Sequence, residues 1–188
     1  GAIGGKGSSE FMAVSEHGED VLVTCNFCDY GANREKAESK LSPVEYEREF
    51  KPMRKEVTPN TRTVEELNKL FGLPGSHMVK TIIYVADGTT VAVCCRGDLE
   101  INEVKLKNLQ GAVLLEIADD QTVVKVTKAP VGFAGPVGLS GVRILFDSSV
   151  EGMTNFLCGC NEEDFHLLDV NLGRDVSAPD KFYDLHNA

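Results

Sequence analysis

Hydrophobic and polar residues alternate along this chain with two periods, one typical of helices and one typical of strands. Between Thr63 and Gly72 the apolar residues recur at helical spacing and share one face. Thr63 and Glu66 match a capping box, and Gly72 is suited to end the helix. The pattern therefore predicts a helix over 63–72. The apolar face is expected to consist of Val64, Leu67, Leu70 and Phe71.

The stretch "VKTIIYVADGTTVAVCCRG" contains two runs rich in β-branched residues, joined at Asp87 and Gly88. An Asp-Gly pair between such runs is typical of a tight hairpin turn. After the second run, Asn102 is suited to cap another helix, "NEVKLKNL", which Gly111 closes. This part of the chain is therefore expected to form a hairpin followed by a short helix.

The remaining segments add strands and one ambiguous element. "AVLLEIA", "VRILF" and "FHLLDV" read as strands, and "DDQTVVKVTKAP" favours a helix that ends before Pro130, although its β-branched residues also suit a strand. Near the start, 21–24 is a β-type run, Asn33 is expected to cap a brief polar helix, and 41–60 reads as an extended linker. The predicted fold class is α/β (α+β), with a single mixed parallel and antiparallel β-sheet and helices packed around it.

Composition narrows the class of protein. The 188 residues carry a net charge of -10, which argues against a broad basic surface for nucleic acid. No apolar run approaches the length of a membrane span, and the first residues lack the pattern of a secretory signal. Adjacent Cys94 and Cys95 do not suit a secreted disulfide framework. We therefore expect a cytoplasmic protein with reduced thiols.

Cys25 and Cys28 form a C-x-x-C pair, the spacing with which two thiolates reach one zinc ion. A structural zinc site needs two more ligands, and the other cysteines and the four histidines offer no second pair at that spacing. We expect an unligated pair near a turn and no metal, with zinc as the alternative.

Three further features are candidates for chemistry, and each also has a purely structural interpretation. Lys80 begins an apolar strand, either with its ammonium reaching water or with a cation directed into a cleft. His166 lies where a strand begins and is either a hydrogen-bonded core histidine or a site residue. The segment "GFAGPVGLSG" is either an ordinary connection or a loop whose uncovered backbone N–H groups bind an oxygen.

Taken together, the segments resemble one family. They are "GAIGGKGSSEF", "CDYGANREKAE", "TVEEL", "VKTIIY", "RGDLEINEVKLKNL", "APVGFAGPVGL", "MTNFLCGCNEEDFH", "VNLGRD" and "FYDLHN". In this order they resemble the editing, or insertion, domain of bacterial-type prolyl-tRNA synthetase, which is related to freestanding prolyl-tRNA-editing deacylases.

The resemblance implies that residues 1–32 flank the insertion as part of the synthetase catalytic core. Residues 33–188 would form the insertion, with its compact part at about 62–175. It also implies hydrolysis, by water, of mischarged alanyl-tRNA on the tRNA for proline. The parent enzyme would be an ATP-dependent, homodimeric proline-tRNA ligase that uses ATP and Mg²⁺, whereas editing would need no cofactor.

The family's site residues transfer by position. The resemblance implies that Lys80 is essential and that the Gly-x-x-x-Pro loop spans Gly132, Phe133, Ala134, Gly135 and Pro136. The backbone N–H groups of Gly132, Phe133, Ala134 and Gly135 are expected to position the ester. It places His166 and Asn155 at the substrate, and Lys105 and Lys107 are added as a small basic track for tRNA. Bulky residues at Gly132 or Gly135 are expected to abolish deacylation without unfolding the domain.

The chain departs from the family pattern at Cys160, where alanine is common, and at Leu172, where an aromatic residue is frequent, which predicts a different pocket shape. Two other readings remain open: a freestanding trans-editing aminoacyl-tRNA deacylase, and a non-catalytic insertion that braces the synthetase or positions tRNA.

Overall fold

The computed structural model describes residues 21–34, 36–38 and 40–187, and the chain divides into two units, Gly1–Ala37 and Glu38–Ala188. The segment "GAIGGKGSSEF" lies outside the described residues, and the assignment of 1–32 to a synthetase core stays a prediction.

In the first unit, β1 (Leu22–Thr24) pairs antiparallel with β2 (Gly31–Asn33). The helix expected from Asn33 is wrong. Asn33 ends β2 instead, and its carbonyl accepts the N–H groups of Lys36 and Ala37 in a turn.

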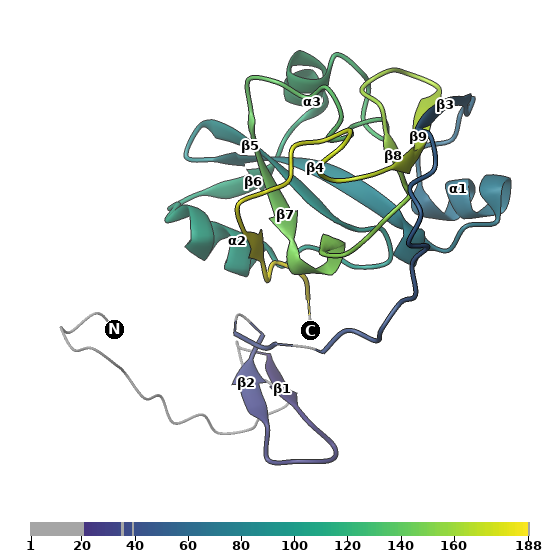
Figure 1. The fold of residues 1–188 in the computed structure, drawn as a ribbon. Helices are drawn as coiled ribbons and strands as arrows, with labels where there is room; N and C mark the ends of the chain where they lie inside the picture. The colour runs from purple at the N-terminus through teal and green to yellow at the C-terminus, as the bar shows by residue number, and fades with distance from the viewer. Residues whose placement is uncertain (1–20, 35, 39, 188) are drawn as a thin grey trace. The chain divides into compact units, whose positions relative to one another are not determined.

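The second unit is built on an eight-stranded sheet in the order β10-β7-β5-β4-β8-β9-β3, with β6 paired to β4 beside this path. The long strands β4 and β5 cross its middle, and the helices lie around them (Figure 1). The strands are β3 (Arg54–Val57), β4 (Met78–Ala86), β5 (Thr89–Arg96), β6 (Leu115–Ile117), β7 (Arg143–Asp147), β8 (Phe156–Gly159), β9 (Phe165–Val170) and β10 (Phe182–Tyr183).

The sheet is mixed, as predicted. β5 pairs with β7 in parallel, β4 with β8 in parallel and β7 with β10 in parallel, whereas β4–β5, β4–β6, β8–β9 and β3–β9 are antiparallel. The predicted hairpin is confirmed: β4 and β5 meet at Asp87 and Gly88, whose φ angles of 46° and 81° are those of a tight hairpin turn.

Three helices form where the capping signals predict them. α1 (Val64–Phe71) has the Thr63–Glu66 capping box and ends at Gly72 in the left-handed conformation. α2 (Glu103–Gln110) is capped by the Asn102 side chain, and α3 (Asp120–Thr127) is the helix favoured for the ambiguous segment. Two 3-10 turns, η1 (Gly75–His77) and η2 (Ser148–Val150), complete the elements. Every helix in the described part of the chain is too short or too polar to cross a membrane.

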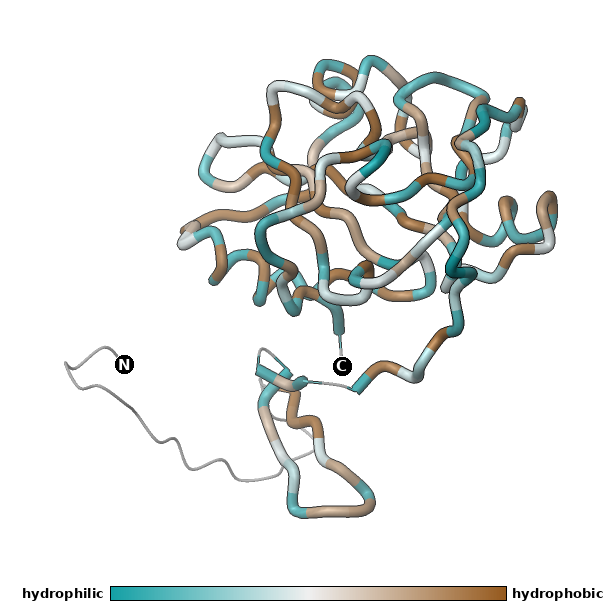
Figure 2. Tube along the Cα trace, in the orientation of Figure 1, coloured by the Kyte–Doolittle hydropathy of each residue, from teal (hydrophilic) through white to brown (hydrophobic). Residues whose placement is uncertain are grey.

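Burial follows the strands. Hydrophobic residues concentrate on the central strands, and the connecting loops are mostly hydrophilic (Figure 2). The predicted helix face is confirmed for Leu67, which is buried with Val64 and Phe71 packed around it, but Leu70 is 52% exposed. The sequence analysis did not predict β3, β8 or β10, and the expectation that 41–60 is all extended linker is wrong at β3. β3 and β10 lie outside the range 62–175 expected for the compact part.

One feature of the sheet positions the site: β4 changes partners along one edge. It pairs with β8 only at Met78 and Val79, and with β6 only from Tyr84 onward. The Met78 carbonyl accepts the N–H of Gly97, the residue directly after β5. Every second residue from Val79 onward therefore directs its N–H and C=O groups to the opposite edge of β4. Thr81 is the outward-directed residue that falls between the two pairings. The sheet therefore has a gap beside β4, with unpaired backbone facing it.

Candidate functional site

The gap beside β4 is occupied by a pocket of about 350 Å³. Its floor consists of buried side chains and its rim of exposed or half-buried ones. The floor includes Met78, Val79, Leu157, Cys158 and His166, and the rim includes Arg62, Glu65, Glu100, Ile117 and Val131. A mostly apolar floor beneath a charged rim suits a small organic group attached to a polar carrier.

The Gly-x-x-x-Pro loop, residues 132–136, is called the glycine-rich loop below, and it forms one wall of this pocket through Gly132 and Ala134. Among the described residues, neither of their N–H groups makes a hydrogen bond within the protein. Phe133 is fully buried beneath the loop, and the Gly135 N–H donates to Asn161 Oδ1 at 3.0 Å. Of the four N–H groups expected to act together, those of Gly132 and Ala134 remain available at the pocket.

Both glycines of the loop are required by close contacts. Gly132 has φ +104°, and a Cβ there would lie 2.6 Å from Arg62 Cβ. A Cβ on Gly135 would lie 1.7 Å from the Gly159 carbonyl oxygen, which is backbone and does not yield easily. A larger residue at Gly135 would therefore push the loop away from β8, so its effect would not be confined to the pocket as expected.

Pro136 is buried and lines a different pocket, which includes residues of β7. Its ring stiffens the far side of the loop and does not reach the pocket beside β4.

Lys80 lies at the pocket from β4, with its side chain 20% exposed. Its Nζ donates to Glu100 Oε1 at 2.7 Å, and the Glu100 side chain is 76% exposed. An ion pair with so exposed a partner contributes only about 0–1 kcal/mol. Lys80 can therefore exchange the Glu100 carboxylate for another anion at little cost.

His166 lies at the inner end of the pocket and is 1% exposed. Its Nδ1 lies 2.7 Å from the buried Thr58 hydroxyl, and its ring packs 5.6 Å from that of Phe133. Burial lowers the pKa of His166 to about 4, and a hydrogen bond to the Gly132 backbone acts in the opposite direction. The imidazole is therefore neutral near pH 7 and acts as a fixed wall of the pocket.

Asn155 does not reach this pocket. It lies on a separate one, and its amide bonds to the main chain of Glu49 and Lys51. It fastens the extended segment before β3 to the body of the domain.

The predicted basic track does not assemble beside Lys80. Lys105 is 8% exposed and donates to Asp184 at 2.9 Å and to the His186 carbonyl at 3.1 Å. Lys107 lies elsewhere on α2 and, like Lys105, is absent from the pocket lining. The structure thus brings Lys80, His166 and the loop together and leaves the two α2 lysines and Asn155 apart.

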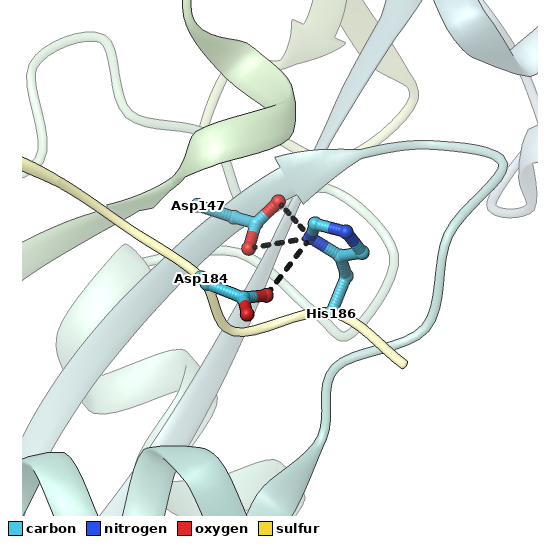
Figure 3. Close-up of side chains that lie close together, drawn as sticks. All are labelled: Asp147, Asp184 and His186. Carbon is cyan, nitrogen blue, oxygen red and sulfur yellow. Dashed lines mark hydrogen bonds and ion pairs between the residues drawn. The ribbon is translucent and has the colours of Figure 1, made fainter. Parts of the chain in front are cut away.

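A second polar cluster contains more reactive side chains than the pocket. Asp147, Asp184 and His186 turn toward one another (Figure 3), and within the described residues they are the group close enough to hold a metal ion. The Asp147 carboxylate, however, accepts the Ser149 and Leu185 N–H groups and lies 3.0 Å from His186 Nδ1. Burial acts to raise the pKa of Asp147, but these hydrogen bonds outweigh it and hold that pKa below its usual value.

The cysteine pair lies in the turn between β1 and β2, with both side chains exposed. The Phe27 N–H donates to the Cys25 sulfur at 3.4 Å, and this bond, aided by Cys28, lowers the pKa of the Cys25 thiol. No third ligating side chain joins the two thiols among the residues that are described.

Sequence reasoning missed three residues around the pocket: Arg62, Thr58 and Asn161. Arg62 lies at the rim over the Phe133 ring, Thr58 supports His166, and Asn161 bonds to the loop. Of these three, Asn161 is the one whose role the sequence could have indicated, since an asparagine in a polar turn between strands is suited to form hydrogen bonds with neighbouring backbone groups.

Known proteins resemble this chain in sequence and in fold. A family model described as "Aminoacyl-tRNA editing domain" matches residues 58–175, which include every residue of the pocket. The proline-tRNA ligase of Geobacter sulfurreducens is 49% identical over 187 residues, which cover 100% of this chain and 32% of the ligase. That of Thermoanaerobacter sp. is 48% identical over 181 residues, covering 95% of this chain and 32% of the ligase. The chain thus spans about a third of the length of these relatives.

Two solved structures share the fold. Hypothetical protein APE2540 aligns with a TM-score of 0.56 and 30% identity, covering 62% of this chain and 79% of its own. A "putative trans-editing enzyme for prolyl tRNA synthetase" aligns with a TM-score of 0.59 and 18% identity, covering 72% of this chain and 87% of its own. The predicted fold class is therefore confirmed both by the sheet and by these neighbours.

Proposed function

This chain belongs to the aminoacyl-tRNA editing domain family, and on that premise we propose that it hydrolyses alanyl-tRNA made in error on the tRNA for proline. The observation that carries the proposal is the pocket beside β4, which is lined by Lys80 and by Gly132 and Ala134, two residues whose N–H groups make no hydrogen bond within the described part of the chain. A second site of this kind is useful because a pocket sized for proline excludes the smaller alanine by only about 10- to 200-fold.

In the proposed reaction, the alanyl ester lies against the loop, with its carbonyl oxygen toward the N–H groups of Gly132 and Ala134. Water adds to the carbonyl carbon, and the two N–H groups stabilise the negative charge that develops on the oxygen. The bond from that carbon to the ribose oxygen then breaks, the ribose oxygen takes a proton, and alanine leaves. We propose that the neighbouring ribose hydroxyl helps to activate the water, since the pocket lining has no cysteine or serine paired with a base.

Lys80 would hold the terminal adenosine or its phosphate. Its present partner, Glu100, is exposed and can be displaced, so the incoming phosphate would replace one weak ion pair with a stronger one. His166 would limit the length of the side chain that the pocket accepts, because the neutral ring is held by Thr58 and cannot swing aside without breaking that bond. Alanine would fit and larger side chains would be excluded.

We further propose that the longer protein is a proline-tRNA ligase of the cytoplasm. That protein would use ATP and Mg²⁺ for its ligase reaction and would act as a homodimer, while the editing reaction proposed here would need no cofactor. Its partners would be tRNA and the remainder of the synthetase. The similarity over the whole chain to proline-tRNA ligases supports this assignment.

The test is hydrolysis of alanyl-tRNA and prolyl-tRNA by the wild-type chain and by Lys80→Ala. The wild type should release alanine and leave prolyl-tRNA intact, and Lys80→Ala should lower kcat/KM by about 100-fold or more. Lys55→Ala is the matched control, because Lys55 also lies on a strand and pairs with an exposed glutamate, Glu162, but is absent from the pocket lining.

Lys55→Ala should keep kcat/KM within about two-fold of wild type, since an exposed ion pair contributes little. If the folded wild type leaves alanyl-tRNA intact, the deacylase proposal fails. If Lys80→Ala retains full activity, the role assigned to the lysine is wrong.

A further inference from the structure

The glycine-rich loop is held by one side chain that the proposed reaction does not otherwise use. Asn161 lies in the turn between β8 and β9 with φ +57°. Its Oδ1 accepts the Gly135 N–H at 3.0 Å, and its Nδ2 donates to the carbonyl oxygens of Gly135 at 3.0 Å and Val137 at 2.9 Å. Its own N–H donates to the Phe133 carbonyl at 2.8 Å. Four hydrogen bonds therefore join this one residue to the loop.

These bonds hold the loop beside β8, as the hydrogen bonds between paired strands hold neighbouring strands together elsewhere in the sheet. The loop has no regular secondary structure at these positions, yet its backbone lies directly against β8. A Cβ on Gly159 would be 2.2 Å from the Ala134 carbonyl oxygen, and a Cβ on Gly135 would meet Gly159 in turn. Two glycines allow this approach, and the Asn161 amide then satisfies the main chain of Gly135 on both its N–H and its C=O side.

The bonded and unbonded groups alternate along the loop. The carbonyl of Phe133 and both backbone groups of Gly135 bond to Asn161. Ala134, which lies between them, lines the pocket, and its N–H makes no hydrogen bond among the described residues. Donors that are already oriented stabilise a developing charge better than donors that must reorganise. Fixing the residues on either side of Ala134 fixes the direction of its N–H.

We propose that Asn161 is a positioning residue for the hydrolysis: its side-chain amide orients the backbone donors of the loop toward the ester oxygen. The inference rests on the proposed function. It predicts that removing the Asn161 amide lowers kcat and does not raise KM, because Asn161 is absent from the pocket lining and would not touch the substrate.

The experiment compares Asn161→Ala and Asn161→Asp with Asn171→Ala in the same chain. Asn171 is the matched control: its amide also makes three hydrogen bonds to neighbouring groups, with Asn155 and Asp169, but it is absent from the pocket lining. Melting temperature and urea unfolding measure the structural loss that both alanine variants share.

Asn161→Ala should lower kcat for alanyl-tRNA by about 100-fold with KM nearly unchanged, since displacing a catalytic group by about 1 Å has an effect of this size. Asn161→Asp keeps the acceptor for the Gly135 N–H but loses both donations, so its kcat should fall between those of the wild type and the alanine variant. Asn171→Ala should keep kcat within about two-fold, because displacement at that end of β9 does not reach the loop.

A second readout does not depend on activity. The Gly135 amide should be protected from hydrogen exchange in the wild type and should lose protection in Asn161→Ala but not in Asn171→Ala. Wild-type kcat in folded Asn161→Ala, an equal loss in Asn171→Ala, or an unprotected Gly135 amide in the wild type would each overturn the inference. If Lys80→Ala behaves as expected but Asn161→Ala keeps kcat, only this inference fails; if the wild type hydrolyses nothing, the proposed function fails with it.

Discussion

The pocket beside β4 and the cluster around Asp147 are two polar regions of the same domain with opposite characters. The cluster brings together two aspartates, a histidine and a lysine, the residue types from which active sites are often built. The loop at the pocket contributes no acid, base or nucleophile. Yet the carboxylate of Asp147 is saturated by main-chain and side-chain donors, whereas the loop leaves backbone donors without partners.

If the reaction takes place at the pocket, as we propose, unused hydrogen-bonding capacity marks the site better than reactive side chains do. At the cluster, Asp147 fastens the C-terminal segment to η2, because it accepts the N–H groups of both Ser149 and Leu185. Lys105 from α2 adds a second attachment through Asp184. At the pocket, Asn161 bonds to both backbone groups of Gly135, whereas the N–H groups of Gly132 and Ala134 have no partner among the described residues.

The largest expected effect separates stability from activity. Asp147→Ala removes a fully buried carboxylate and leaves the Leu185 N–H and the His186 ring without their acceptor, so the free energy of unfolding should fall by about 3 kcal/mol. Urea unfolding measures this loss, and kcat/KM per folded molecule should stay at the wild-type value. A large fall in kcat/KM in molecules that remain folded would mean that the cluster takes part in the reaction.

The pocket and the cluster should lose their contributions to stability in different pH ranges. His166 has a pKa of about 4 in the folded state and about 6.5 when unfolded, so between these values the unfolded chain binds a proton that the fold does not. Stability should therefore fall by about 3 kcal/mol as the pH is lowered from about 6.5 to 4.

Asp147 acts in the same direction but in a lower pH range, because its folded pKa is also lowered, from an unfolded value of 3.8. Its contribution is complete above that value and is lost as the pH falls below it. Urea midpoints measured across both ranges should show the upper step disappear in His166→Gln and the lower step weaken in Asp147→Ala. An upper step that survives His166→Gln would show that another group titrates there.

The smallest expected effect concerns Lys105. Lys105→Met keeps the apolar stem and removes the ion pair with Asp184, so stability should fall by only about 1 kcal/mol. The slope of log K against log salt for tRNA binding should not change, whereas Lys80→Ala should reduce that slope by about 1. If both variants reduced the slope equally, the result would support the basic track for tRNA that the sequence analysis expected.

The sequence predicted best those elements whose signals are local. The capping box at Thr63, the Asp87–Gly88 turn and the Asn102 cap each involve residues within a few positions of one another, and all three form. β3 was missed because its polar sequence becomes a strand only through pairing with β9, more than a hundred residues later. β10 has just two residues and likewise depends on a distant partner, β7.

The candidate site divides in the same way. Lys80, His166 and the glycine-rich loop were candidates from the residue pattern, and the resemblance to a family gave them their expected roles. The structure places all three at one pocket. The spacing of residues along the sequence did not reveal that Asn161 accepts the Gly135 N–H or that Asp184 pairs with Lys105, because each contact joins segments far apart in the sequence. Such contacts decide which backbone and side-chain groups remain available.

The gap beside β4 also bears on how this strand edge is protected from pairing with another chain. An unpaired strand edge is a template onto which the strand of another molecule can add, and long exposed edges promote aggregation. Here the unpaired stretch around Thr81 lies within a pocket walled by α1, the glycine-rich loop and β8. A neighbouring chain would have to displace these walls to pair with it. The pocket walls thus leave the unpaired backbone of β4 accessible to a small ligand but not to a β-strand of another chain.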